Sequence, residues 1–432
     1  MLAIGRGCKK ADGDTFKGLR QAFGYFPSAR YTGDFLPEIR RSVPARRGSK
    51  MYGDNEMKKR YDYIDYAKGI IIIMVVLSHA GYEGIDSLSN ICMILLFIVS
   101  GFTFSAKGKS VRELIVSRFK RIILPYWEAV FVYAVFEIWR AGYFGYADYK
   151  IFFGGIVSLF YGITCKAPVV PGVADFLFEI FSYKTHPQGF LDIILPTNAH
   201  LWFLPAMFTG SVIFFIYTHY APKRGLPDVL MMAVLLGLAY PESLPAAPQL
   251  PYSIGAGFFC CACLIAGLNL KRLDIFALSR KNYLLYALTA AVTLALSCYL
   301  DVSPGSFVNR DYPLGNIWGV YLFFLLGVAA SVFLLFTLKL ISGKIHLQLL
   351  LEIGKNTMTI YLWHMIFLTV FGIIVLKIFA VPAELGIYAM AFIPAARTDL
   401  RLLASALSII ACLLLSRIVP DTPKEGQRDK LS

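Results

Sequence analysis

The sequence predicts an all-α, polytopic integral membrane protein with about ten transmembrane helices and both termini in the cytoplasm. Only 16% of its 432 residues are charged, whereas a soluble domain carries about a quarter. Hydrophobic residues make up 57%, and the mean hydropathy is +0.60. These residues form blocks close to the roughly 20 residues that cross a bilayer. The composition therefore disfavours both a disordered chain and a soluble enzyme.

The predicted spans follow from these apolar blocks, taken in order. They are 67–83, 88–106, 121–140, 199–218, 226–241, 252–269, 282–300, 315–341, 357–380 and 401–419. Basic residues precede the first block and fill the loops after even-numbered blocks, whereas the opposite loops hold few. By the positive-inside rule this distribution indicates an even number of spans and cytoplasmic termini. The net charge of +14 is then an orientation signal rather than a nucleic-acid surface.

The domain organisation follows from the same blocks. Residues 1–60 mix Gly, Pro and basic residues, which predicts a mostly disordered cytoplasmic tail. Residues 61–420 form the membrane domain, and 421–432 form a short cytoplasmic tail. The apolar pieces of 141–198 are too short to span, so we expect an external loop that lies on the membrane or partly re-enters it. No zinc-type Cys or His spacing is present, so no metal site is expected.

The first span carries the sharpest polar pattern. Lys68 and His79 are eleven residues apart, which places them on one helix face and His79 about 16 Å along the axis, near mid-membrane. Asp65 falls close to the same face. Ionisable side chains inside a membrane are costly and usually functional. The alternative is a snorkelling Lys68 and a packing histidine.

Two further segments each allow two interpretations. Arg118 and Arg121, at i and i+3, are either a basic cytoplasmic flank or an anion clamp, since Arg binds phosphate bidentately. His200 and Trp202 open the fourth span at the external surface, where Trp ordinarily anchors and His200 could bind an external substrate. Ser100, near the end of the second span, favours close helix packing when taken alone.

The ninth span carries a second polar stripe. Thr357, Tyr361 and His364 stand at i, i+4 and i+7, so they share one helix face within the cytoplasmic half of the span. Two spans thus place a histidine on a polar stripe. If the two stripes converge, they form a polar core inside the membrane domain.

The ordered set of motifs resembles the family 3 membrane acyltransferases, over residues 61 to about 419. The motifs are Tyr63-Ile64-Asp65…Lys68-X10-His79, Phe97…Ser100-Gly101-Phe102, Arg118…Arg121-Ile122…Pro125-Tyr126, His200-Leu201-Trp202-Phe203 and Ile360-Tyr361-Leu362-Trp363-His364. The resemblance implies transfer of an acyl group, usually acetyl, from cytoplasmic acyl-CoA as a co-substrate, with no permanently bound cofactor. It implies an acceptor hydroxyl on a cell-surface glycan or its lipid-linked precursor, and a multi-pass protein of a bacterial inner membrane.

The resemblance also implies residue roles. His79 matches the catalytic histidine, and we assign Lys68 and Asp65 to its catalytic face. Lys68 stands where many members have Arg, which keeps the charge but loses the bidentate fork. Arg118 and Arg121 match the basic pair near the donor's phosphates. The imidazole of His79 acts either as a general base or as a nucleophile that carries the acyl group.

Five further residues receive expected roles. Ser100 and Tyr361 are candidates at the donor site, where a hydrogen-bond donor must stabilise the thioester-derived oxyanion. His200, Trp202 and His364 match family positions and are expected to bind substrate.

Two other functions compete with the acyltransferase. A secondary transporter or exporter of a small metabolite such as succinate could use the same intramembrane charges for proton coupling. The lack of a visible internal repeat and the clustered arginines weigh against it. A degenerate family member with a signalling or scaffold role is disfavoured by the retained His79 and Arg121. The expected partners are acyl-CoA, the glycan acceptor and membrane lipids, without nucleic acid.

Overall fold

A computed structural model describes residues 61–82, 85–106, 108–143, 159, 199–221, 225–241, 250–273, 284, 287–288, 291–292, 316–342, 346–381, 393–394 and 396–418. All of them belong to a compact unit that begins at Arg60. The predicted tails, 1–60 and 421–432, lie outside these residues, as do most of the predicted loop 141–198 and of the span 282–300. Most of the residues described are helical, and no strand occurs among them, which confirms the all-α prediction.

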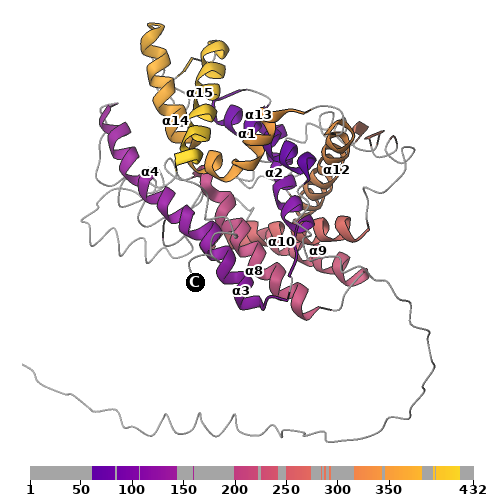
Figure 1. Ribbon diagram of the computed structural model, residues 1–432. Helices are drawn as coiled ribbons and strands as arrows, with labels where there is room; N and C mark the ends of the chain where they lie inside the picture. Colours follow the sequence, from indigo (N-terminus) through magenta and orange to yellow (C-terminus); the bar gives the residue numbers. More distant parts are fainter. Residues whose placement is uncertain are drawn as a thin grey trace, which may run out of the picture. The chain divides into compact units, whose positions relative to one another are not determined.

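The helices follow one another along the chain with short connections where these are described (Figure 1). They are α1 (Asp62–His79), α2 (Ile85–Phe102), α3 (Val111–Arg118), α4 (Leu124–Tyr143), α8 (Phe203–Tyr220), α9 (Leu226–Ala239), α10 (Ile254–Arg272), α12 (Ile317–Ser342), α13 (Gln348–Lys355), α14 (Thr357–Ile378) and α15 (Thr398–Ile418). Three short elements are the π-helix η1 (Phe119–Ile123) and the 3-10 helices η2 (Ala199–Trp202) and η4 (Pro251–Ser253).

Six helical segments are long and apolar enough to cross a membrane, so the chain is a multi-pass membrane protein. They are Val111–Arg140, His200–Tyr220, Pro251–Arg272, Ile317–Ser342, Thr357–Ile378 and Thr398–Ile418. Two shorter apolar helices are Met93–Phe102 and Leu226–Ala239. Helix α1 has 18 residues, but Asp62, Asp65 and Lys68 fall within its first seven, which lowers its apolar character.

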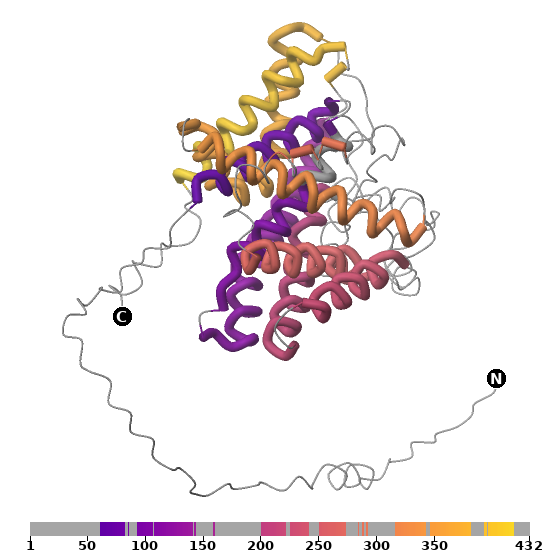
Figure 2. Tube along the Cα trace, turned by 90° about the vertical axis from the view of Figure 1, so that its right-hand side faces the viewer, coloured from indigo at the N-terminus to yellow at the C-terminus, as the bar shows by residue number. Residues whose placement is uncertain are grey.

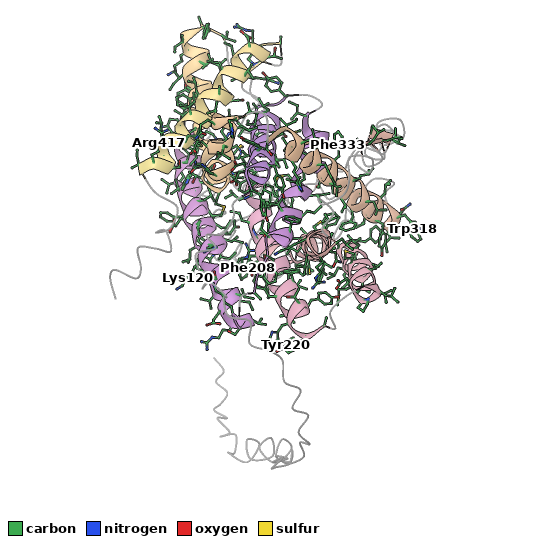
Figure 3. The ribbon with its side chains drawn as sticks, turned by 45° about the vertical axis from the view of Figure 1, so that its right-hand side comes forward. Lys120, Phe208, Tyr220, Trp318, Phe333 and Arg417 are labelled. Carbon is green, nitrogen blue, oxygen red and sulfur yellow. The ribbon has the colours of Figure 1, made fainter. Side chains whose placement is uncertain are left out.

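Exposed aromatic side chains lie at the ends of two of these segments. Trp318 projects from the first turn of α12 and Tyr220 from the last residue of α8 (Figure 3); they are 69% and 77% exposed. Trp and Tyr are enriched where a membrane meets water. Their placement agrees with helices that span a bilayer.

Several helix ends differ from the sequence prediction. Helix α1 begins five residues before the predicted span and ends at His79, four residues before its predicted end. The basic segment before the third span, predicted as a loop, is helical from Val111 because Ser110 and Glu113 form a capping box. Helix α3 then continues through η1 into α4 as one long helix (Figure 1). Helix α13 was not predicted.

The π-turn in this long helix has a local cause. Pro125 has no N–H and cannot donate to the carbonyl four residues before it. The N–H of Leu124 donates to the carbonyl of Phe119, five residues back. One extra residue is thereby accommodated, which widens the turn between Arg118 and Arg121.

Glycines let pairs of helices touch backbone to backbone. A Cβ added at Gly101 on α2 would lie 2.1 Å from the carbonyl oxygen of Leu264 on α10, and one at Gly267 on α10 would lie 2.0 Å from that of Ile98 on α2. Gly354 on α13 meets the carbonyl of α1's Asp65 in the same way. Small residues commonly permit such close approach between membrane helices.

Helix α1 lies at the centre of the packing. It contacts α2, α12, α13, α14 and α15. Helices α14 and α15 pack along each other, and α8 and α9 both pack on α10 (Figure 2). The last residue of α1 is His79, so the end of this central helix places an imidazole among residues from distant parts of the chain.

Candidate active site

Three histidines meet inside the protein. His79 ends α1, His200 lies in η2, and His364 is the eighth residue of α14. The ring centroids of His79 and His364 are 5.0 Å apart and nearly stacked. His200 meets both rings edge-on, with centroids 6.1 Å and 5.7 Å away. The histidines of the two polar stripes predicted on the first and ninth spans therefore do meet, and His200 joins them.

His79 and His364 form a hydrogen-bonded dyad whose proton positions follow from its surroundings. Nδ1 of His364 lies 2.9 Å and 3.0 Å from the carbonyl oxygens of Ile360 and Tyr361. Carbonyls only accept, so this nitrogen carries a hydrogen. In the neutral ring, Nε2 then holds a lone pair, and it lies 2.9 Å from Nδ1 of His79. For two neutral rings the donor must be His79 Nδ1–H, which leaves a lone pair on His79 Nε2.

His200 is buried and retains an unsatisfied ring nitrogen. Its Nε2 has no hydrogen-bond partner among the residues that the structure describes. Its carbonyl accepts a short hydrogen bond from the hydroxyl of Tyr361, which also accepts from the N–H of Phe203 at 3.3 Å. The ring of Tyr133 meets the imidazole edge-on at 4.7 Å. Since buried polar groups are nearly always paired, an unpaired one calls for an explanation, and a catalytic role is one of those known.

Neighbouring helices fix the backbone around His364. The hydroxyl of Tyr133 on α4 donates to the carbonyl of Leu362 at 2.9 Å. The hydroxyl of Ser408 on α15 donates to the carbonyl of His364 itself, also at 2.9 Å. All four residues are buried. The dyad is thus supported by α1, α4, α14 and α15 together.

A second polar group lies around Arg118. Its guanidinium donates to Ser100 on α2 at 3.2 Å and lies over the ring of Phe215 on α8 at 5.8 Å. Arg121 is exposed, whereas Arg118 is partly buried. The π-helix η1 begins at Phe119, between the two arginines, so their spacing departs from that of a regular α-helix.

Aromatic contacts connect this arginine site with the histidines. Phe97 lies one turn before Ser100 on α2. Its ring stacks on Phe203 at 4.6 Å and meets Trp202 edge-on at 6.4 Å. Trp202 and Phe203 follow closely on His200 in the chain. The ring of Phe203 meets Tyr361 at 5.6 Å, and the ring of Tyr361 lies 6.3 Å from that of His364, so ring contacts lead from Phe97 to the imidazoles.

Lys68 and Asp65 lie apart from the histidines. They form an ion pair at 3.4 Å in the first half of α1, where the side chain of Asp65 is 3% exposed and that of Lys68 is 32% exposed. Lys68 is eleven residues from His79, which is about 16 Å of helix. The structure does not bring this pair to the imidazoles. No cluster of metal-ligating side chains occurs among the residues described.

A model of an acyltransferase domain, that of family 3, matches residues 61–417. The chain belongs to the family 3 acyltransferases. No curated protein and no solved structure matched it. In this family 3 acyltransferase, the sequence motifs that carried the resemblance fall into three places: the histidine cluster with Tyr361, the group around Arg118 and Ser100, and the Asp65–Lys68 pair.

Three residues around the cluster escaped the sequence analysis of this acyltransferase. Tyr133 is one of several aromatic residues in an apolar span, and Ser408 is a small residue of a kind common in helix packing. Arg401, described below, opens the last predicted span, where a basic residue is expected as a flank. No local signal distinguishes their contacts from ordinary packing.

Proposed function

We propose that this family 3 acyltransferase transfers an acyl group, in the first instance acetyl, from cytoplasmic acyl-CoA to a hydroxyl of a cell-surface glycan or its lipid-linked precursor. The observation that carries the proposal is the His79–His364 dyad, which leaves a lone pair on His79 Nε2. The proposal includes about ten spans, cytoplasmic termini and a place in the inner membrane. The positive-inside charge pattern supports that orientation.

The donor is polyanionic, so its phosphates should remain with the cations. Arg118 and Arg121 supply these, and we group Lys68 with them rather than with the imidazoles because its ammonium is partly exposed and far along α1. The thioester arm is slender and largely uncharged. The aromatic series of Phe97 and Trp202 offers it an apolar path toward the histidines.

The chemistry begins with His79 as general base. Its Nε2 takes the proton of the acceptor hydroxyl while the oxygen attacks the thioester carbonyl carbon. The carbon–sulfur bond then breaks, and the leaving thiolate of coenzyme A regains the proton from the imidazolium. His364 stabilises that imidazolium, because its Nε2 accepts the hydrogen bond from His79 Nδ1 throughout the cycle.

The reaction also requires a hydrogen-bond donor for the oxyanion, and His200 supplies it. Its unpaired Nε2, when protonated, can donate to the oxyanion that forms on the thioester carbonyl. The hydroxyl of Tyr361 already donates to the carbonyl of His200. In this proposal Tyr361 therefore supports His200 and does not itself contact the oxyanion.

The lone pair on His79 also permits a covalent route, in which Nε2 attacks the thioester, releases coenzyme A and carries the acyl group to the acceptor. Mixing the protein with radiolabelled acetyl-CoA without acceptor, then denaturing it, separates the two routes. Label retained on wild type and absent from His79→Ala supports the covalent intermediate. If neither protein retains label and wild type still transfers acetyl to the acceptor, the general-base route is supported.

The decisive experiment measures donor turnover by purified protein in detergent. Radiolabelled acetyl-CoA is supplied with and without crude surface glycan, and release of free coenzyme A is followed for wild type, His79→Ala and Arg118→Ala. We expect His79→Ala to be inactive and Arg118→Ala to raise the KM for acetyl-CoA about tenfold or more, because a charge-assisted hydrogen bond is lost. His219→Ala is the matched control, since His219 is exposed on the last turn of α8.

Two results would contradict the proposal. Correctly folded His79→Ala protein that transfers acetyl at the wild-type rate would exclude the dyad as the reacting centre. Wild-type protein that neither binds nor turns over acetyl-CoA, but exchanges a metabolite by counterflow in proteoliposomes, would favour a transporter.

A further inference from the structure

The helix that carries His79 ends immediately after it. The N–H of Gly81 donates to the carbonyl of Ser78 at 2.8 Å, and that of Tyr82 donates to the carbonyl of Leu77 at 3.3 Å. Gly81 has φ +80°. These are the two bonds and the left-handed residue of a Schellman motif. The position of the His79 ring therefore depends on where this turn is held.

The first turn of α15 holds it. Nη1 of Arg401 donates a short hydrogen bond to the carbonyl of Gly81. The hydroxyl of Tyr82 donates to the carbonyl of Thr398 at 2.6 Å. Two hydrogen bonds thus join the turn after His79 to the start of α15, one donated by α15 and the other donated by the turn.

Arg401 is unusual in being a buried cation bound by carbonyls. It is 8% exposed. Its Nε and Nη2 both donate to the carbonyl of Ile393, at 3.1 Å and 2.7 Å. A buried charge is costly unless it is hydrogen-bonded, and the planar fork of Arg matches two carbonyls at fixed positions as Lys cannot. The guanidinium therefore links two backbone segments and fixes their separation.

The same helix holds the other half of the dyad. Ser408 is seven residues after Arg401, which places both on one face of α15, about 10.5 Å apart along the axis. Its hydroxyl donates to the carbonyl of His364. Helix α15 thus bonds to the backbone next to His79 at one point and to the backbone of His364 two turns later.

We propose that Arg401 is a positioning residue for the reaction: with Ser408, it makes α15 the brace that sets His79 against His364. This inference rests on the proposed role of the dyad. It assigns no chemistry to Arg401, whose guanidinium contacts backbone carbonyls and not the imidazoles. A brace that fixes reacting groups acts on kcat, because small misplacements of such groups cost large factors in rate.

The test compares Arg401→Lys and Arg401→Gln with wild type, and uses Arg397→Gln as the matched control. Arg397 lies four residues earlier and forms a bidentate pair with Asp399 instead of contacting α1. We expect both Arg401 variants to lose about tenfold or more in kcat, with the KM for acetyl-CoA within about twofold of wild type, and the control to be unaffected because exposed pairs contribute little. Tyr82→Phe removes only the hydrogen bond to the carbonyl of Thr398 and should lower kcat less than the Arg401 variants do. This variant also provides a test if the Arg401 variants do not fold.

A purely structural role predicts different results in two further measurements. In a His364→Ala background the Arg401→Lys substitution should cost less than twofold, because the dyad it positions is already broken; full multiplication of the two losses would overturn the inference. Histidine ¹⁵N NMR of the folded proteins reports the His79 Nδ1–H signal without any turnover. We expect Arg401→Lys to shift or lose it. An unchanged signal in folded Arg401→Lys protein would refute the brace, whether or not the proposed acyl transfer is observed.

Discussion

The hydrogen bond between the two imidazoles allows a prediction with a worked magnitude. His364→Phe removes the acceptor of His79 Nδ1–H while keeping a ring of similar size. A neutral hydrogen bond contributes about 1 kcal/mol, and one to a charged group contributes about 1.5–3 kcal/mol. His79 is charged only during proton transfer, so the substitution costs about 0.5–2 kcal/mol more in the transition state than in the ground state. That difference is roughly a 2- to 30-fold loss of kcat.

The assay is the initial rate of coenzyme A release at saturating acetyl-CoA. We expect the KM for acetyl-CoA to be unchanged, because the bond does not involve the donor and the part of its strength that is gained only in the transition state affects kcat. His219→Phe, an exposed histidine, controls for the substitution itself. An unchanged kcat would show that the dyad bond is not used. Inactivation as complete as in His79→Ala would show that His364 reacts directly instead of orienting its neighbour.

Three further predictions concern stability and support. Glu137→Ala leaves its buried partner Arg140 without a carboxylate, which should lower the unfolding temperature in detergent by the equivalent of about 3–5 kcal/mol, and adding Arg140→Met should recover most of it. Gly267→Ala, whose Cβ would lie 2.0 Å from a backbone oxygen, should prevent a monodisperse preparation, whereas Gly237→Ala, 3.4 Å from a hydroxyl, should be tolerated. Tyr361→Phe should lower both the unfolding temperature and kcat, because it leaves the buried carbonyl of His200 without the hydrogen bond from the Tyr361 hydroxyl.

Sequence periodicity predicted much of the candidate site, because it determines which residues share a helix face. It placed His79 on one polar stripe and His364 on another. Periodicity could not predict that the two histidines meet, since it does not show which helix packs against a given face. His200 was interpreted from the sequence as a residue at the external surface, and its contacts with both other rings depend on packing that the sequence does not show.

Helix ends were predicted less well, for a local reason. Apolar residues continue past His79, so composition extended the first span, whereas the positive φ of Gly81 ends the helix. Composition likewise could not predict the π-turn, because this turn depends on the local effect of Pro125 and on how the long helix packs. Arg401 was not singled out from the sequence, because only the folded structure shows the carbonyls that surround it.

The bond between Gly81 and Arg401 joins residues 320 positions apart. At a synthesis rate of about 5–20 residues per second, roughly 16 to 64 s separate the appearance of the two residues on the ribosome. Throughout that interval α1 exists without the hydrogen bond from Arg401 to the turn at its end. For most of it, His364 on α14 has not yet been synthesised either. The proposed reacting geometry therefore cannot be complete until α15 has been synthesised. A chain cut within α15 should insert most of its helices and still have no assembled centre.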